Sequence, residues 1–150
     1  MAGVIEVAQS AGIQLWITSK EELASPSFAE KLYSQNINLI VLAGFLALLP
    51  ANLIRKFSER IINIHPALLP KHGGKGMYGI NVHKAVLKSG DAETGITIHQ
   101  VNENYDEGKT LLQKTCPVAN NSSPEEVAKA VQHLEHTFYP PFIESYLEKL

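Results

Sequence analysis

Apolar runs and helical patterns alternate along the chain. Residues 38–44 form a near-continuous apolar run, which is typical of a parallel strand covered on both faces. A helical pattern that begins at Pro50 separates this run from a second apolar segment, residues 61–64. Residues 13–17 alternate between the two sides of an extended chain and therefore predict another strand. This order of elements predicts an α/β fold with a mostly parallel, doubly wound sheet.

The second half of the chain continues the pattern. Residues 94–101 and 110–118 have strand patterns, and they could pair antiparallel through the polar turn between them. Ser123 and Glu126 form a capping-box pattern, and apolar side chains recur at helical spacing after it. The pair Pro140-Pro141 predicts a break in that helix, followed by a short last helical segment. Shorter helices are expected over residues 4–11, after Ser25-Pro26, and over residues 81–88.

Residues 71–79 form a loop that is rich in glycine and holds four of the chain's 10 glycines. Its spacing does not match the phosphate-binding G-x-x-x-x-G-K-[ST] pattern. The glycines predict a mobile loop. Such a loop either closes over a substrate or serves as a surface connection, and the sequence leaves both roles open.

Composition narrows the class of protein. The chain has 150 residues, a formal net charge of -2 and 45% hydrophobic residues, so we expect residues 1–150 to form a single soluble domain. Without an extended basic patch or a long apolar run, neither a nucleic-acid partner nor a membrane span is expected. The single cysteine, Cys116, excludes an intramolecular disulfide. The N-terminus has no signal-peptide pattern, so a cytoplasmic location is expected.

The strand over residues 61–64 carries unusual polar side chains. Asn63 and His65 are two positions apart and therefore share one face of the strand. Pro66 ends the strand directly after them, and the ends of strands are where α/β sheets collect their ligands. Each residue alone has a simpler structural explanation, but an amide beside an imidazole at this place is a candidate for half of an active site.

A carboxylate could complete this candidate site. Asp106 lies in the polar turn after the strand over residues 94–101, so it could reach the same edge of the sheet. A carboxylate favours a protonated imidazole, and an amide N–H can hold a developing oxyanion. The sequence has no G-x-S-x-G serine elbow and no H-E-x-x-H zinc signature, and no metal site is predicted. Asn63, His65 and Asp106 would therefore suit direct acyl transfer between two bound substrates.

The motif around this strand resembles a known family. Residues 63–71, N-I-H-P-A-L-L-P-K, together with residues 41–45, 95–99 and 106–108, are similar to the phosphoribosylglycinamide formyltransferases of purine biosynthesis. The resemblance runs from about Ile5 to the end of the chain. It implies a Rossmann-type formyltransferase domain that transfers a formyl group from 10-formyltetrahydrofolate to the amine of glycinamide ribonucleotide.

The resemblance also implies roles for particular residues. Asn63 would hold the formyl oxygen, and His65 would be the imidazolium that stabilises the oxyanion. Asp106 would keep His65 charged and organise a water that shuttles the proton. Glu135 would bind the ribose hydroxyls of the substrate. Ile64 and Pro66 would also contact the substrate. The folate pocket would be lined by Leu46 and Leu49 and by the backbone of Val101, Asn102, Glu103, Asn104 and Tyr105.

The sequence departs from the family in two places. The family begins with a strand, a glycine-rich turn and a helix that binds the substrate phosphate, and no such segment precedes the first helix here. We therefore expect the domain to be truncated at its N-terminus. Ala47 stands where the family often carries arginine, so contact with the folate tail is expected to be weaker or made elsewhere. A formyltetrahydrofolate deformylase and a non-catalytic folate-binding fragment remain the alternatives, and the chain could form a homodimer.

Overall fold

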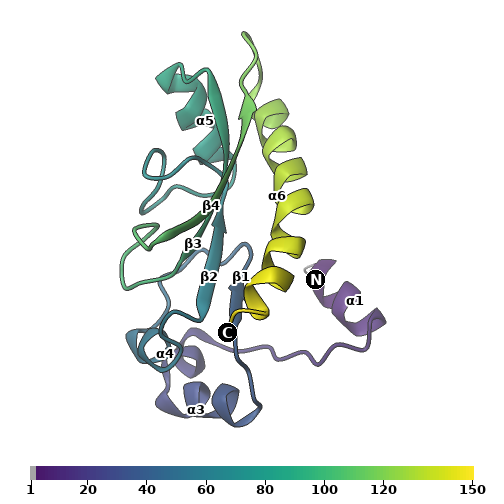
Figure 1. Cartoon of the computed structure of the whole chain (residues 1–150), viewed down its shortest axis with the longest axis vertical. Coiled ribbons are helices and arrows are strands. Elements are labelled where there is room, and N and C mark those ends of the chain that lie inside the picture. Colours follow the sequence, from purple (N-terminus) through teal and green to yellow (C-terminus); the bar gives the residue numbers. More distant parts are fainter. Residues whose placement is uncertain (1–2) are drawn as a thin grey trace.

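The computed structural model describes residues 3–150 as one four-stranded sheet with helices around it (Figure 1). The strands lie in the order β1-β2-β3-β4. In chain order the elements are α1 (Gly3–Ser10), α2 (Lys20–Ala24), α3 (Pro26–Ser34), β1 (Ile40–Leu42), α4 (Ala51–Lys56), β2 (Ile61–His65), α5 (Ile80–Ser89), β3 (Glu93–Gln100), β4 (Thr110–Pro117) and α6 (Pro124–Leu147).

The sheet is mixed. β1 and β2 are parallel, whereas β2–β3 and β3–β4 are antiparallel pairs. The predicted α/β class and the predicted antiparallel pairing of the last two strands are therefore confirmed, but the described strands are not mostly parallel. His65, at the end of β2, pairs with Thr97 in the middle of β3, and the first half of β3 extends beyond β2. The chain leaves β2 through the glycine-rich loop, passes through α5 and enters β3 at the same end of the sheet. β3 therefore runs antiparallel to β2.

Two cores cover the two faces of β2. Ile62 and Ile64 pack with β3 and with α6, which lies along one side of the sheet in Figure 1. Ile61 points to the opposite face, where it packs with Leu53 and Phe57 around α4. Asn63 and His65 share that second face but lie nearer to the end of the strand. The strand therefore changes from core to polar side chains toward its C-terminal end.

Several helix ends follow the predicted sequence signals. The capping box is present: the backbone N–H of Glu126 donates to the Ser123 hydroxyl at 3.2 Å, and the Glu126 carboxylate accepts from the Ser123 N–H at 2.7 Å. Gly90 ends α5 in the left-handed conformation, with φ 68°. Within residues 3–150, no helix is both long enough and apolar enough to cross a membrane.

The strand predicted over residues 13–17 is not formed. This segment has no regular secondary structure and connects α1 to the helices near β1 in Figure 1. Ile13 and Ile17 are 62% and 80% exposed. Alternation favours an extended backbone, but a strand also needs a neighbour to accept and donate its ladder hydrogen bonds. Among the described strands none pairs with this segment, so the prediction was wrong.

The break predicted at Pro140-Pro141 is also wrong, because α6 continues through both prolines. A proline inside a helix costs about 3 kcal/mol, so other contacts have to offset it. The Tyr139 hydroxyl donates to the Leu42 carbonyl at 2.9 Å, and the Tyr146 hydroxyl donates to the Glu59 carbonyl at 3.2 Å. Apolar side chains on both sides of the prolines also pack into the core. Tertiary packing therefore keeps the helix continuous.

Candidate active site

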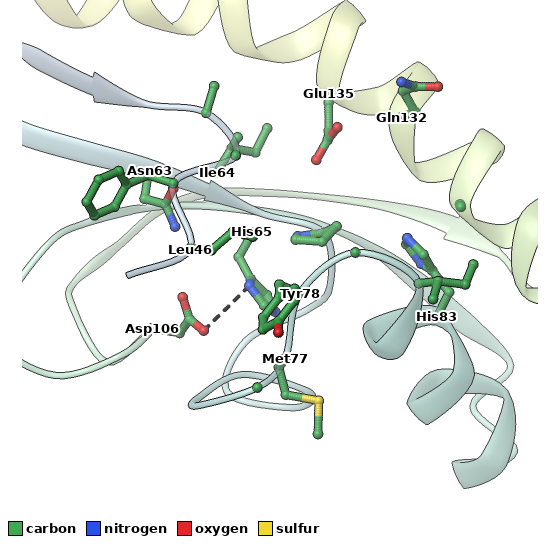
Figure 2. A pocket seen from close by; sticks show the side chains of 18 of the residues that line it. Leu46, Asn63, Ile64, His65, Met77, Tyr78, His83, Asp106, Gln132 and Glu135 are labelled. Carbon is green, nitrogen blue, oxygen red and sulfur yellow. Dashed lines mark ion pairs between the residues drawn. The ribbon is translucent and has the colours of Figure 1, made fainter. Parts of the chain in front are cut away.

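The end of β2 brings the predicted polar residues together. His65 is 3% exposed and its ring faces the turn that follows β3 (Figure 2). Its Nδ1 atom lies 3.5 Å from Oδ2 of Asp106. On the other side of the ring, Nε2 lies 2.8 Å from the backbone carbonyl of His72. A carbonyl oxygen can only accept, so Nε2 carries a hydrogen, and Nδ1 is the nitrogen that faces the carboxylate.

Local backbone geometry positions Asp106. The residue adopts a positive φ of 56°, in the left-handed region that aspartate enters more easily than most residues. The backbone N–H of Gly74 donates to its Oδ2 at 2.9 Å. Two residues later, a Cβ on Gly108 would lie 1.7 Å from the Gln100 carbonyl oxygen, so only glycine fits there. The tight return of the chain at Gly108 holds the Asp106 turn against the end of β3.

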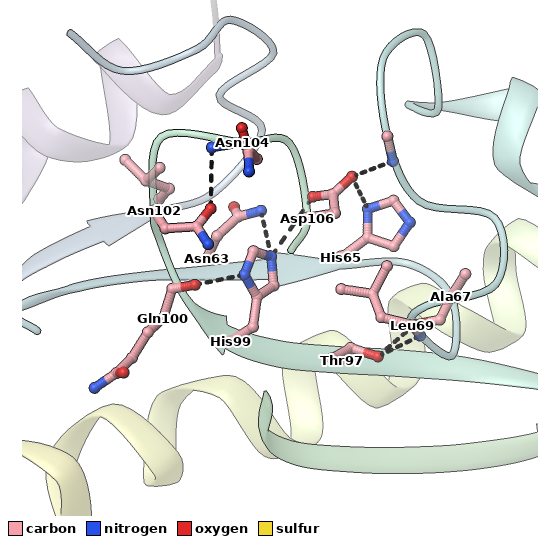
Figure 3. A network of polar contacts seen from close by, with 12 residues as sticks. Asn63, His65, Ala67, Leu69, Thr97, His99, Gln100, Asn102, Asn104 and Asp106 are labelled. Atoms are coloured by element: carbon pink, nitrogen blue, oxygen red, sulfur yellow. Dashed lines mark hydrogen bonds and ion pairs between the residues drawn. The ribbon is translucent and has the colours of Figure 1, made fainter. Parts of the chain in front are cut away.

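A second histidine orients the amide of Asn63. The Nδ1–H of His99 donates to the Gln100 carbonyl at 2.8 Å (Figure 3). In the neutral ring Nε2 is then an acceptor, and it lies 3.3 Å from Nδ2 of Asn63. The same Nε2 lies 3.6 Å from Oδ1 of Asp106. An amide nitrogen has two hydrogens, so Asn63 can donate one to His99 and present the other to a ligand.

Burial and these contacts shift the pKa values of His65 and Asp106. Burial lowers the pKa of His65, and the opposing effects of Asp106 and the His72 carbonyl do not compensate. Burial alone would raise the pKa of Asp106, but three effects together lower it: a hydrogen bond from His99 when its Nε2 carries a hydrogen, the Gly74 N–H, and the charge of His65 when that ring is protonated. Without substrate these shifts favour the ionised form of the carboxylate and disfavour the charged form of the imidazole.

A cavity of about 570 Å³ opens next to these residues. Its walls come from the segment after β1, the end of β2, the glycine-rich loop, the start of α5 and the first half of α6. Glu135 projects into it from α6, across from Asn63 and His65 (Figure 2). Burial raises the pKa of Glu135, and the nearby His136 opposes this shift. The cavity thus has carboxylates on two sides.

All of the predicted catalytic and substrate-binding residues line this cavity. The predicted residues that line it are Leu46, Asn63, Ile64, His65, Pro66, Tyr105, Asp106 and Glu135. The other predicted folate residues lie outside its lining. Leu49 and Val101 pack in the core around Phe57. Asn102, Glu103 and Asn104 form the turn beyond β3, where the Asn102 side chain accepts from the Asn104 N–H at 3.0 Å.

Some lining residues were not predicted from the sequence. Gln132 lies on the same face of α6 as Glu135, one turn earlier, and the i, i+3 spacing could have identified it. Met77 and Tyr78 reach the cavity from the glycine-rich loop, which favours a role of that loop in covering a ligand. His83 is 5% exposed and its Nδ1 atom has no hydrogen-bond partner among residues 3–150. Within this described range no cluster of three or more His, Cys, Asp or Glu side chains is placed to hold a metal ion.

Comparison with known proteins identifies the family. The profile of the formyl transferase family matches residues 3–143. The chain belongs to the formyl transferase family. Within it, the chain is similar to the chloroplastic phosphoribosylglycinamide formyltransferases of Arabidopsis thaliana, at 46% identity over 91% of the chain, and of Vigna unguiculata, at 41% over 98%. It spans 49% of the length of each of these relatives.

Solved structures give the same formyl transferase fold. Glycinamide ribonucleotide transformylase 1 of Symbiobacterium toebii matches with a TM-score of 0.85 at 29% identity, over 97% of this chain and 68% of that one. The phosphoribosylglycinamide formyltransferase of Bacillus halodurans matches with a TM-score of 0.85 at 27% identity, over 99% of this chain and 76% of that one. The resemblance predicted from the motif around β2 is confirmed.

Proposed function

We propose that this chain carries the reaction centre of a phosphoribosylglycinamide formyltransferase, which moves a formyl group from 10-formyltetrahydrofolate to the amine of glycinamide ribonucleotide. The observation that carries the proposal is the meeting of Asn63, His65 and Asp106 at one end of a cavity whose far wall holds Glu135. The names of the relatives support the identities of the two substrates. The chain spans 49% of the length of each of those relatives. The identities of the formyl donor and of the amine acceptor are therefore proposed for this chain.

The reaction needs no nucleophile from the protein. The acceptor amine forms a C–N bond to the formyl carbon, the bond from that carbon to the donor nitrogen breaks, and one amine proton ends on the donor nitrogen. During the transfer the formyl oxygen becomes negatively charged, so donors that face this oxygen stabilise the transition state most. The protein therefore has to hold an oxyanion and to move a proton.

Asn63 and His65 meet the first requirement. The second N–H of the Asn63 amide is the donor that can face the formyl oxygen. Burial lowers the pKa of His65, so the ring takes up a proton most readily when negative charge develops beside it. That proton is the one that the acceptor amine loses, and it passes on to the donor nitrogen when the C–N bond of the donor breaks. The imidazolium would then form during the reaction and not before it. Asp106, ionised and 3.5 Å from Nδ1, would stabilise that charge and accept the proton's hydrogen bond.

The remaining walls suit the two substrates. Glu135 offers acceptor oxygens that could bind ribose hydroxyls, and Gln132 lies beside it on α6. Ile64 and Pro66 also line the cavity. Leu46 and Tyr105 line it as well, and together they could form an apolar wall for the flat ring system of the donor.

The names of the relatives favour an amine acceptor over water, which a deformylase would use. The cytoplasmic location and the homodimer stay predictions from the sequence. Two relatives carry "chloroplastic" in their names, so a plastid is the competing location.

The proposal is tested by supplying the chain with 10-formyltetrahydrofolate, with and without glycinamide ribonucleotide, and measuring the deformylated folate and the formylated product. We expect the two products to appear in equal amounts and only when the amine is present. Deformylated folate without formylated product would identify water as the acceptor. Binding of each substrate is measured separately by calorimetry, and a chain that binds neither substrate contradicts the proposal.

A further inference from the structure

A three-residue turn, His72-Gly73-Gly74, contacts both members of the candidate ion pair. The His72 carbonyl accepts from Nε2 of His65 at 2.8 Å. The Gly74 N–H donates to Oδ2 of Asp106 at 2.9 Å. The relative position of His65 and Asp106 therefore depends on where this turn lies. No part of the proposed formyl transfer assigns a function to the side chain of His72.

The turn is pressed closely against the site. A Cβ added to Gly73 would lie 2.6 Å from Cδ2 of Leu69 and 3.2 Å from Cβ of Asp106, so only glycine fits without a shift. His72 itself has a positive φ of 55°, which is uncommon for a residue with a side chain. A backbone held in this region needs contacts that keep it there. The side chain of His72 supplies such a contact.

That contact is with Asp91, which lies between the end of α5 and the start of β3. Nε2 of His72 lies 2.6 Å from Oδ2 of Asp91, and the two side chains are only 12% and 16% exposed. Lys71 reaches the other oxygen of the same carboxylate, with Nζ 2.9 Å from Oδ1, but its side chain is 68% exposed. These hydrogen bonds lower the pKa of Asp91, so the carboxylate is ionised at neutral pH. A short hydrogen bond to an ionised group is among the stronger side-chain contacts.

The turn also determines which nitrogen of His65 is free. Because the His72 carbonyl requires a hydrogen on Nε2, the neutral ring has its lone pair on Nδ1, facing Asp106. A proton taken up during the reaction then arrives between the imidazole and the carboxylate. If the carbonyl moved away, the ring could instead place its hydrogen on Nδ1 and donate to Asp106. The nitrogen without a hydrogen would then be Nε2, on the side of the ring away from Asp106.

We propose that the His72–Asp91 contact is a positioning device that anchors the turn and thereby fixes the tautomer and orientation of His65. The inference rests on the proposed function for its effect on catalysis, but its structural part stands independently. His72 and Asp91 are positioning residues, since neither is among the residues that line the cavity.

The experiment measures the tautomer of His65 by nitrogen-15 NMR in the unliganded chain. We expect the wild-type ring to carry its hydrogen on Nε2. In Asp91→Ala and His72→Asn we expect the Nδ1–H form to become populated. Asparagine enters the left-handed region readily but is shorter than histidine, so His72→Asn tests the loss of the contact and not of the backbone conformation. Asp91→Asn, which keeps an acceptor oxygen without the charge, should give a smaller change.

The matched control is Lys71→Met, which removes the other partner of Asp91 and leaves the His72 contact in place. We expect this variant to keep the wild-type tautomer. In formyl transfer, Asp91→Ala and His72→Asn should lower kcat by about tenfold while the KM for the folate stays unchanged, because the orientation of a catalytic group is lost and not a binding contact.

An Nδ1–H tautomer in the wild type would overturn the proposal, and so would unchanged tautomers in Asp91→Ala and His72→Asn. Since the tautomer is measured without substrate, a chain that transfers no formyl group would contradict the proposed function and leave this test intact.

Discussion

One face of β2 packs in the core of the molecule, and the other face carries two residues of the candidate active site. Ile62 and Ile64 point toward α6 and pack in the larger core, whereas Asn63 and His65 point to the other face and meet His99 and Asp106. Each face has fully buried side chains, with Ile62 at 0% and His65 at 3% exposure. Burial alone therefore does not distinguish the core from the site. The difference lies in whether a buried group has only apolar neighbours or a set of polar partners.

This comparison predicts that changes on the two faces have different consequences. A change on the apolar face should cost stability with the chemistry preserved in the molecules that fold. A change on the polar face should cost formyl transfer with stability nearly preserved.

The largest effect is expected on the polar face, from His65→Asn. Loss of the group that takes up charge beside the oxyanion should reduce formyl transfer by about 10²- to 10⁴-fold. Folate binding should be largely kept, because the apolar wall at Leu46 and Tyr105 is untouched. Transfer rates and calorimetric binding measure the two quantities in the same preparation. Weakened folate binding in parallel with the rate would argue for a general disruption of the cavity.

Truncation on the apolar face should have the largest effect on stability. Ile62→Ala removes buried methyl groups from a fully enclosed position and should lower the free energy of unfolding by about 2–5 kcal/mol. Denaturant titration measures the change. A matched control is Val41→Ala on β1, which is 37% exposed and should cost less than about 1 kcal/mol. Equal losses in both variants would contradict the assignment of Ile62 to the core.

The pH dependence of stability should also differ between the wild type and His65→Asn, and we expect this effect to be smaller than the two above. Burial lowers the pKa of His65 below its unfolded value of about 6.5, so the folded state binds fewer protons than the unfolded state. The resulting stability is present above that unfolded pKa and is lost as the pH falls through it toward the folded pKa. Unfolding titrations between pH 7 and pH 5 should show a shallower loss for His65→Asn than for the wild type. An unchanged slope would mean that the pKa of His65 is the same in the folded and unfolded states.

The smallest effect is expected from Tyr139→Phe on α6. This change removes the hydroxyl that donates to the Leu42 carbonyl at 2.9 Å and should cost about 1 kcal/mol. Tyr33→Phe, at a side chain that is 54% exposed, is the matched control and should leave the free energy of unfolding nearly unchanged. An unchanged free energy of unfolding in Tyr139→Phe would show that the Tyr139 hydroxyl does not help to keep α6 continuous through its two prolines.

The sequence predicted the α/β class and the pairing of Asn63 with His65 on one face of a strand, because both depend on local patterns. It also predicted that Asp106 would join them, but the strand ends alone do not explain this. β3 runs antiparallel to β2 and ends beside Ile62, so the turn after β3 has to fold back to bring Asp106 to His65. The reversed direction of β3 could not be predicted, since it depends on the path of the glycine-rich loop. The unbroken α6 depends on Tyr139 and Tyr146 reaching distant carbonyls.

The surroundings of the site were also hidden from the sequence. The contact between His72 and Asp91 joins residues 19 positions apart and has no motif. Leu49 and Val101 match the folate positions of the family but pack in the core around Phe57 in the unliganded chain. Their part in folate binding stays a prediction. Side-chain direction at such positions depends on tertiary packing, which pattern and spacing do not report.

In the proposed reaction the ionised carboxylate of Asp106 supports formyl transfer through His65. The most direct test compares the single-turnover rate of formyl transfer in the wild type and in Asp106→Asn, with substrate binding measured in parallel. Asparagine keeps the shape but removes the charge that faces Nδ1 at 3.5 Å. We expect the rate to fall by about 10²-fold or more with folate binding retained. A rate in Asp106→Asn close to that of the wild type would contradict the claim.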